Sequence, residues 1–180
     1  MSKYSGYEAF DYLEEGEDYN SFSLPDQIHN GERYEVPLGE DEEMRAEKLS
    51  EESVIISFHE HPFYFPLETQ EIPDYFREGR VQTCYEGLAK SNVDGVFDHL
   101  INDYGTVRSP NGWQWDDTIY DLGLRLSDIA HQDQVIRCDG VDDIRRAHEQ
   151  GKTAFVPSIE GTAMIENELD RIEQLYGMGV

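Results

Sequence analysis

His59 and His61, two residues apart, are the side chains in this sequence whose type and spacing best suit metal chemistry. They follow the short apolar run 54–58, and β-favouring residues over that length predict a buried strand rather than a helix. Because successive side chains of a strand point to opposite faces, both imidazoles are expected on the face of Ser57 and away from Phe58. The pair is thus predicted at the carboxyl end of a parallel strand, where α/β barrels hold catalytic and metal-binding groups.

A carboxylate on a second predicted strand could complete the ligand set. The strand predicted at 154–161 carries Glu160 near its end, and the side chain of Glu160 is expected on the same face as Ser158. If both strands belong to one sheet, the carboxylate of Glu160 is expected to lie near the two histidines. Two imidazoles and a carboxylate are a plausible set of zinc ligands. Alone, an H-x-H pair is a weak signal, and Glu160 could equally be a solvated carboxylate before a turn.

Three more polar residues lie next to these strands in the sequence. Asp98 and His99 follow the strand predicted at 93–97 and could contribute to the same site, although a polar strand end or a helix cap is the commoner role of such residues. Glu60 is expected on the opposite face from the histidines. Glu60 and Asp98 are therefore candidates for groups that support the metal ligands without touching the metal, and Glu60 could equally lie at the surface.

The composition excludes several other function classes. The chain of 180 residues has 39 acidic against 14 basic residues, a formal charge of −25 and a pI near 4.3. Such a surface repels phosphate backbones and anionic membranes, so we expect neither a nucleic-acid nor a membrane partner. Acidic residues spread over the whole chain indicate adaptation to a salt-rich cytoplasm, and an acidic mesophilic protein is the alternative. No nucleotide-binding glycine motif, G-x-S-x-G motif or Cys–His pair supports nucleotide or acyl-enzyme chemistry.

The sequence also predicts a cytoplasmic location. Its first residues lack the apolar segment of a signal peptide, and no apolar run reaches membrane-spanning length. Cys84 and Cys138 are far apart and fit no zinc-finger spacing, so we expect two inert thiols in a reducing compartment.

Strands alternating with amphipathic helices predict an α/β fold with parallel βαβ units. The expected strands are 54–58, 93–97, 135–138 and 154–161, and the expected helical segments are 40–49, 74–90, a helix capped by Asp116 or Asp117, 141–150 closed by Gly151, and a last helix capped by Asn167. Pro157 argues against a central position for its strand and suggests a bulge. Residues 1–39 are expected to form an acidic, aromatic extension that lies over a domain of residues 40–180.

Several segments together resemble the membrane (renal) dipeptidases, a family of metallopeptidases in the amidohydrolase superfamily. They occur in the same order over roughly residues 45–180. The matching segments are 57–62 (SFHEHP), 92–97 (NVDGVF), 143–152 (DIRRAHEQGK), 158–161 (SIEG) and 169–180.

The resemblance implies a (β/α)8 barrel of the amidohydrolase type, of which this chain carries the N-terminal half. It implies two zinc ions in the complete enzyme, with His59 and His61 on one of them and Glu160 bridging the pair. The substrate would be a dipeptide or related amide, hydrolysed by a metal-activated water. No catalytic acid or base is assigned within this chain, because the family's remaining ligands and its catalytic aspartate correspond to positions after Val180.

Two departures from the family pattern keep other functions open. His61 stands where dipeptidases usually have aspartate, and the usual E-G-G is Glu160-Gly161-Thr162. H-x-H is common in the wider superfamily and leaves a lactonase or phosphoesterase as an alternative. Half a parallel barrel also exposes strand edges and apolar faces, so we expect association, with a homo-oligomer as one form. A non-catalytic metal-binding or interaction fragment is the remaining alternative.

Overall fold

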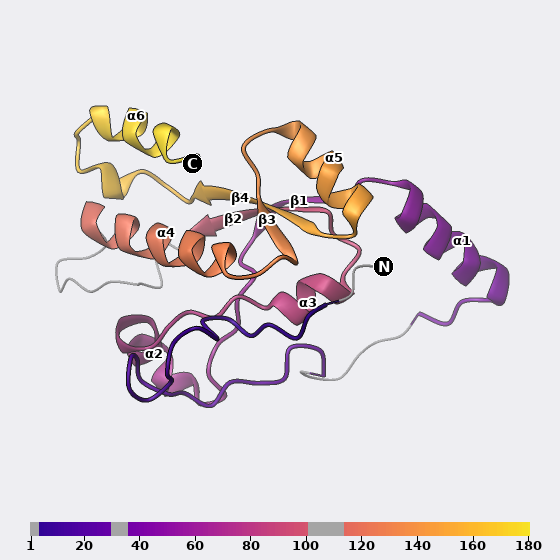
Figure 1. Cartoon of the computed structure of the whole chain (residues 1–180), viewed down its shortest axis with the longest axis horizontal. Coiled ribbons are helices and arrows are strands. Elements are labelled where there is room, and N and C mark those ends of the chain that lie inside the picture. Colours follow the sequence, from indigo (N-terminus) through magenta and orange to yellow (C-terminus); the bar gives the residue numbers. More distant parts are fainter. Residues whose placement is uncertain (1–3, 30–35, 101–113) are drawn as a thin grey trace.

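The computed structural model describes residues 4–29, 36–100 and 114–180, which form an α/β fold around one parallel sheet (Figure 1). The helices are α1 (Glu40–Glu52), α2 (Ile72–Glu78), α3 (Tyr85–Lys90), α4 (Trp115–Ala130), α5 (Val141–Gln150) and α6 (Asp170–Gly177), and the strands are β1 (Ile56–Glu60), β2 (Gly95–Leu100), β3 (Val135–Arg137) and β4 (Thr153–Ile159). The predicted alternation of strands and helices is confirmed. The segment 74–90, predicted as one helical stretch, contains parts of two helices, α2 and α3.

The strands run parallel in the order β1-β2-β4-β3. In a simple barrel consecutive strands are neighbours, whereas here β4 returns between β2 and β3. The pairing of β2 with β4 is regular from Gly95 opposite Ala154 to Leu100 opposite Ile159. The parallel sheet agrees with the predicted α/β class, and the strand order differs from that of consecutive barrel strands.

Helices α4 and α5 pack on opposite faces of the sheet. Ile129 of α4 packs with Phe155 of β4, and this face holds the largest apolar core. Ile144 of α5 packs instead with Ala154, the strand neighbour of Phe155, whose side chain points the other way. The cause is the reversal of strand order at β3, because a right-handed crossover that runs back along the sheet must pass over the other face.

Pro157 lies in the interior strand β4 and pairs with Asp98 of β2 without a bulge. The prediction that this proline argues against a central position and suggests a bulge is therefore wrong. The reason is that β3 pairs with β4 only from Thr153 to Phe155. The carbonyl of Phe155 accepts a hydrogen bond from the backbone N–H of Cys138 on the β3 side, so the nitrogen of Pro157, two residues later, faces the same side. There β3 has ended, and no strand partner needs a donor.

The ends of the helices agree only in part with the capping residues predicted from the sequence. The cap of α4 is Gln114 rather than an aspartate, and the carboxylate of Asp117 accepts a hydrogen bond from the Gln114 N–H at 2.9 Å. The cap of α6 is Leu169 rather than Asn167, which has a φ of 63°. The end of α5 at Gly151 is as predicted, with a left-handed φ of 62° that glycine adopts without strain.

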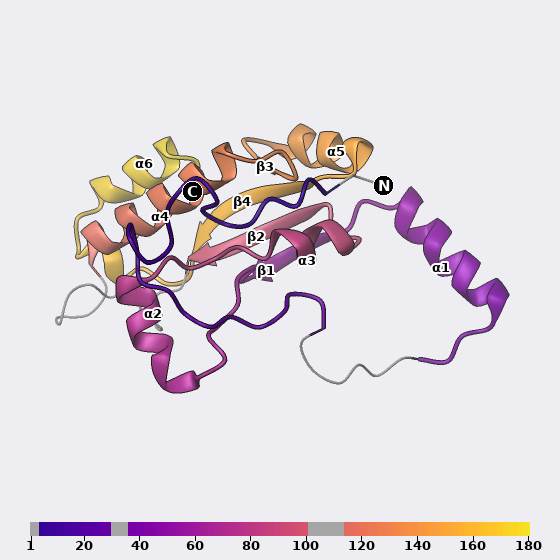
Figure 2. The same cartoon turned by 60° about the horizontal axis from the view of Figure 1, so that its bottom comes forward.

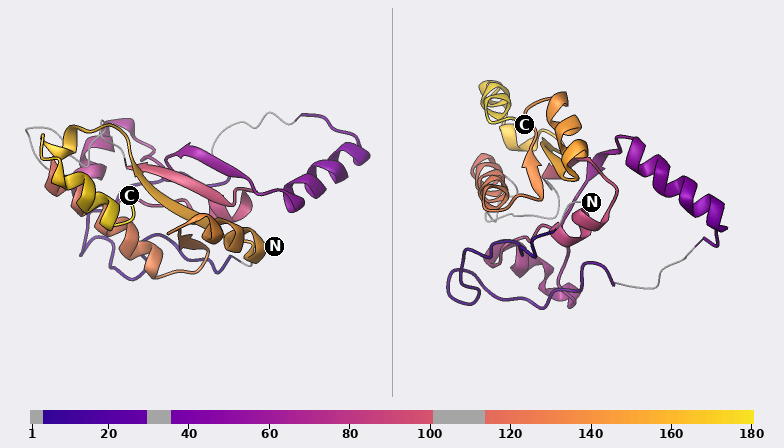
Figure 3. Two further views of the ribbon diagram at one scale, coloured as in Figure 1. Left: turned by 90° about the horizontal axis from the view of Figure 1, so that it is seen from above. Right: turned by 45° about the vertical axis from the view of Figure 1, so that its right-hand side comes forward.

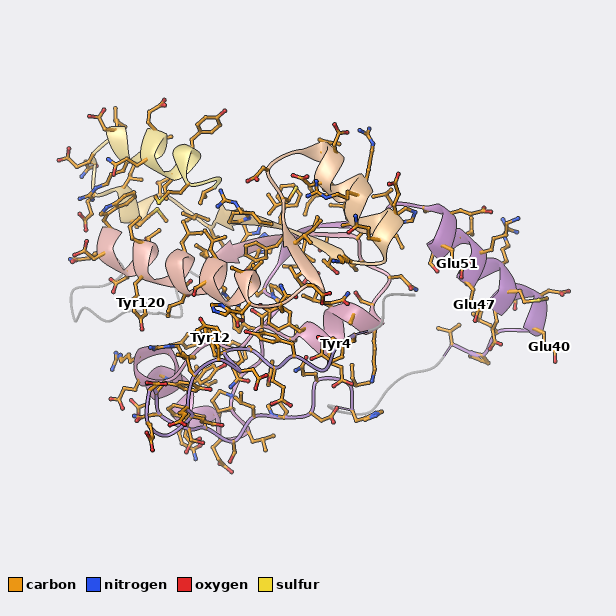
Figure 4. All side chains as sticks on the ribbon, in the orientation of Figure 1. Tyr4, Tyr12, Glu40, Glu47, Glu51 and Tyr120 are labelled. Atoms are coloured by element: carbon orange, nitrogen blue, oxygen red, sulfur yellow. The ribbon has the colours of Figure 1, made fainter. Side chains whose placement is uncertain are left out.

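The N-terminal segment (residues 4–29), drawn in indigo, runs across the sheet face that carries α3 and α4 (Figure 2). Its attachment centres on Asp128 of α4, which is only 1% exposed. Asp128 accepts hydrogen bonds from the Tyr7 hydroxyl at 2.6 Å, the Phe10 N–H at 2.8 Å and the Tyr85 hydroxyl at 2.8 Å. Tyr12, labelled in Figure 4, adds a further contact. Its ring stacks on that of His131, with centroids 3.7 Å apart. Aromatic side chains therefore hold this segment against the sheet domain.

Helix α1 projects away from the rest of the described structure (Figure 3). None of its residues is buried, and Glu40, Glu47 and Glu51 are among the acidic side chains along it (Figure 4). Its acidic first turn suits the positive end of the helix dipole. The helix predicted at 40–49 is thus confirmed and extends to Glu52. Within the described ranges, no helix combines the length and the apolar character needed to cross a membrane.

Candidate metal centre

A bulge in β1 sets the direction of the first histidine. The pairing of β1 with β2 shifts by one residue between Ser57 and Glu60, so that Phe58 and His59 together oppose Phe97. A bulge of this kind interrupts the alternation of side chains and bends the strand locally.

Phe58 and His59 consequently lie on the same face of the sheet. The ring of Phe58 is 5.1 Å from that of Phe97, and the ring of His59 stacks on His99 at 4.1 Å. Phe97 and His99 are two residues apart on β2 and share a face. The prediction that His59 lies on the face of Ser57, away from Phe58, is therefore wrong, because strict alternation makes no allowance for the bulge.

His61 is oriented by a backbone group of the neighbouring strand. Its Nδ1 lies 2.8 Å from the carbonyl oxygen of His99, which can only accept, so Nδ1–H donates. This bond fixes the tautomer and leaves Nε2 as the ligand atom, which is how histidines that bind metals are commonly held. The rings of His59 and His61 are perpendicular, with centroids 5.1 Å apart.

Glu160 reaches the two histidines from the end of β4, across the intervening strand β2. The ligand atoms of His59, His61 and Glu160 all lie within 4.8 Å of one another, and no other cluster of three or more such residues occurs in the described parts of the chain. Donors bound to one tetrahedral zinc are about 3.3–3.6 Å apart, so a short approach would complete the set. His59 and Glu160 are exposed, which leaves them room for such an adjustment. The structure thus brings together all the predicted ligands in one candidate metal site.

The two predicted supporting residues do not touch the cluster. Asp98 is fully buried on the other face of the sheet, with Oδ2 3.6 Å from Nε of Arg125 in α4. Burial raises the pKa of the Asp98 carboxyl, against the opposing effect of Arg125. Glu60 is exposed and accepts a hydrogen bond from the Ser57 hydroxyl at 2.8 Å, as a surface group would.

A cavity of about 570 Å³ opens on the same face as the candidate metal ligands, and its mostly apolar wall also includes Arg137 and Asp139. Phe97 and Val156 contribute to its wall from the sheet, two residues before His99 and Ser158 on the same strand faces. The remaining wall comes from α5, the β3–α5 turn and the C-terminal segment (Ile144, Val141, Cys138, Tyr176 and Val180 among them). Phe97 lies opposite the bulged residues Phe58 and His59 of β1, so this part of the wall adjoins the ligand His59.

Two residues, one beside the ligands and one behind them on the other face of the sheet, carry little signal in the sequence. His99 was a weak candidate as a direct ligand, yet in the structure its carbonyl orients His61 and its ring supports His59. Arg125 lies in the middle of α4, where an arginine normally indicates an exposed helix face, but it is only 4% exposed. A charged residue among the apolar positions of an amphipathic helix is the one feature that could have identified it.

The sequence matches no protein-family model, and no curated protein gives a significant match. Among solved structures, the chain is similar to an amidohydrolase from Pseudomonas aeruginosa, with a TM-score of 0.50 and 18% sequence identity. The match covers 74% of this chain and 34% of that protein, so this chain spans about a third of the length of its structural neighbour. At this identity the likeness concerns the fold alone.

Proposed function

We propose that this protein is a metal-dependent hydrolase of the amidohydrolase superfamily that cleaves a dipeptide or a related small amide. The observation that carries the proposal is the meeting of His59, His61 and Glu160 at the carboxyl ends of two parallel strands. This is the edge at which α/β barrels and open α/β sheets hold their reactive groups. The amidohydrolase fold of the structural neighbour supports the same superfamily.

The residues of this chain would bind and orient a divalent metal, for which zinc is the best fit. Two imidazoles and one carboxylate are a common donor set for catalytic zinc, which leaves a position for water or substrate. When bound, zinc supplies an activated water and polarises the substrate carbonyl. His61 would present Nε2 because its Nδ1–H is held by the His99 carbonyl. Glu160 would serve both this metal and a second one if further residues supplied ligands for the second.

Apolar side chains lie beside the candidate ligands on the same face of the sheet, and in this proposal they have two roles. The cavity walled in part by Phe97 and Val156 would receive an apolar part of the substrate, beside the ligand His59. Phe58, a residue that is 70% exposed, would be covered by an associating chain.

A substrate panel on the zinc-loaded protein tests the proposal. We expect hydrolysis of dipeptides that falls to the uncatalysed rate after chelation and returns with added zinc. Hydrolysis of lactones or phosphoesters instead would favour the alternative suggested by His61 in place of aspartate. Zinc bound at His59 and His61 with no turnover of any of these substrates would identify a non-catalytic metal-binding chain and contradict the proposed activity. Glu60→Ala is the matched control, because Glu60 is exposed and lies outside the ligand cluster.

A further inference from the structure

Arg125 occupies a buried position behind the candidate metal centre. It lies on α4, on the face of the sheet opposite the ligand cluster, and only 4% of it is exposed. Its guanidinium contacts two separate segments, and each of them holds His61 through one backbone hydrogen bond. No residue of α4 belongs to the ligand cluster itself.

The first contact is with β2. Arg125 Nε lies 3.6 Å from Oδ2 of Asp98, whose side chain is fully buried. Neither carboxylate oxygen of Asp98 has a hydrogen-bond partner, nor has Arg125 Nε, among the described residues. Their mutual attraction offsets part of the cost of burying both charges, and the buried Asp121 of α4 is a second acidic neighbour of Arg125. The residue after Asp98 is His99, whose carbonyl accepts the hydrogen bond from His61.

The second contact is with the loop that follows His61. Arg125 Nη1 donates to the Thr83 hydroxyl at 2.9 Å, and Thr83 forms an antiparallel bridge with Phe63. The guanidinium carbon also lies 5.3 Å from the centre of the Phe63 ring, within the range of a cation–π contact. Phe63 in turn donates its backbone N–H to the carbonyl of His61 at 2.7 Å.

We propose that Arg125 is a positioning residue for His61, which it holds by fixing Asp98 on β2 and Phe63 in the following loop. The inference rests on the proposed metal centre and adds to it a residue from the other face of the sheet. Buried ion pairs are often no more stabilising than apolar side chains of the same size. An apolar pair at these two positions would therefore stabilise the fold about as well. What the charged pair adds is a fixed backbone geometry at the end of β2, where His99 orients His61.

Two variants separate positioning from stability. Arg125→Met removes the charge and both contacts, and Arg125→Lys keeps the charge but loses the planar fork that reaches two partners at once. If Arg125→Met does not fold, the double variant Asp98→Leu with Arg125→Met replaces the whole pair by apolar groups, which proteins commonly tolerate. The matched control is His148→Ala, which breaks the pair of His148 with Asp94, 3.0 Å apart, at the opposite end of β2.

Two readouts are needed, one with zinc and one without. Zinc affinity is measured by competition with a chromophoric chelator, and the His61 ring tautomer is measured by ¹⁵N NMR of the metal-free protein at a pH where the ring is neutral. We expect Arg125→Met, or the double variant, to bind zinc about ten- to a hundredfold more weakly. In the same variant His61 should change from a single Nδ1–H tautomer to a mixture of tautomers. Arg125→Lys should retain part of the zinc affinity and part of the preference for the Nδ1–H tautomer. His148→Ala should lose stability with both properties unchanged.

Arg125→Met, or the double variant, with the zinc affinity and the His61 tautomer of the unmodified protein would overturn the inference. Equal losses in His148→Ala would also overturn it, because they would mean that general destabilisation is the cause. If the unmodified protein binds no zinc at His59 and His61, the proposed metal centre fails. The tautomer measurement still decides whether Arg125 positions His61, so the two failures are distinguishable.

Discussion

Replacement of His59 by alanine is expected to abolish zinc retention by the protein. His59 supplies one of the three clustered donors, and its ring is already held against His99 at 4.1 Å. Loss of a residue that only supports a metal ligand commonly lowers affinity ten- to a hundredfold, so loss of a ligand should lower it by more than about a hundredfold. The measurement is zinc content after gel filtration, together with the affinity from chelator competition.

The control for this prediction is the adjacent residue. Glu60→Ala removes an exposed carboxylate whose hydrogen-bond partner is the Ser57 hydroxyl, so the zinc content should stay the same. Because the chain is strongly acidic, the comparison needs enough salt to suppress weak binding to surface carboxylates. Equal zinc content in His59→Ala and the unmodified protein would show that the metal is bound elsewhere.

Replacement of Asp128 by alanine is expected to lower the free energy of unfolding by about 3 kcal/mol or more. The carboxylate is buried and accepts three hydrogen bonds, from Tyr7, Phe10 and Tyr85. Removing it leaves a backbone N–H and the hydroxyl of Tyr85 without this acceptor in the core. Urea unfolding at constant salt measures the loss, and limited proteolysis should show earlier cleavage within residues 4–29.

A second acidic residue provides the comparison for Asp128. The side chain of Asp142 is 94% exposed and pairs with Arg145 on the surface of α5. Asp142→Ala should change the unfolding free energy by less than about 0.5 kcal/mol. A similarly small change for Asp128→Ala, with unaltered cleavage, would mean that the N-terminal segment is held by other contacts.

Local patterns in the sequence were sufficient to predict most helices and strands and to select the candidate metal ligands. The apolar run before His59 predicted β1, and the run before Glu160 predicted β4. Glycine at position 151 predicted the end of α5 because a left-handed backbone there favours it. The expectation that parallel strands bring their carboxyl ends together then sufficed to place Glu160 near the histidines.

Features that depend on pairing between distant segments could not be predicted from the sequence. The return of β4 between β2 and β3 depends on how the crossovers pack, and no local signal records it. The same holds for Pro157, which occupies a central strand only because β3 stops short. The bulge after Ser57 and the burial of Arg125 are likewise set by the neighbouring strand and helix rather than by local propensity.

The most direct test of the candidate metal centre is a crystal structure of the zinc-loaded protein with anomalous scattering measured at the zinc edge. We expect a zinc peak about 2.0–2.2 Å from ring nitrogens of His59 and His61 and from a carboxylate oxygen of Glu160. In the same crystal, the Nδ1–H of His61 should still donate to the carbonyl of His99. A zinc ion bound only by other residues, or a fully loaded crystal with no peak between these three side chains, would contradict the account.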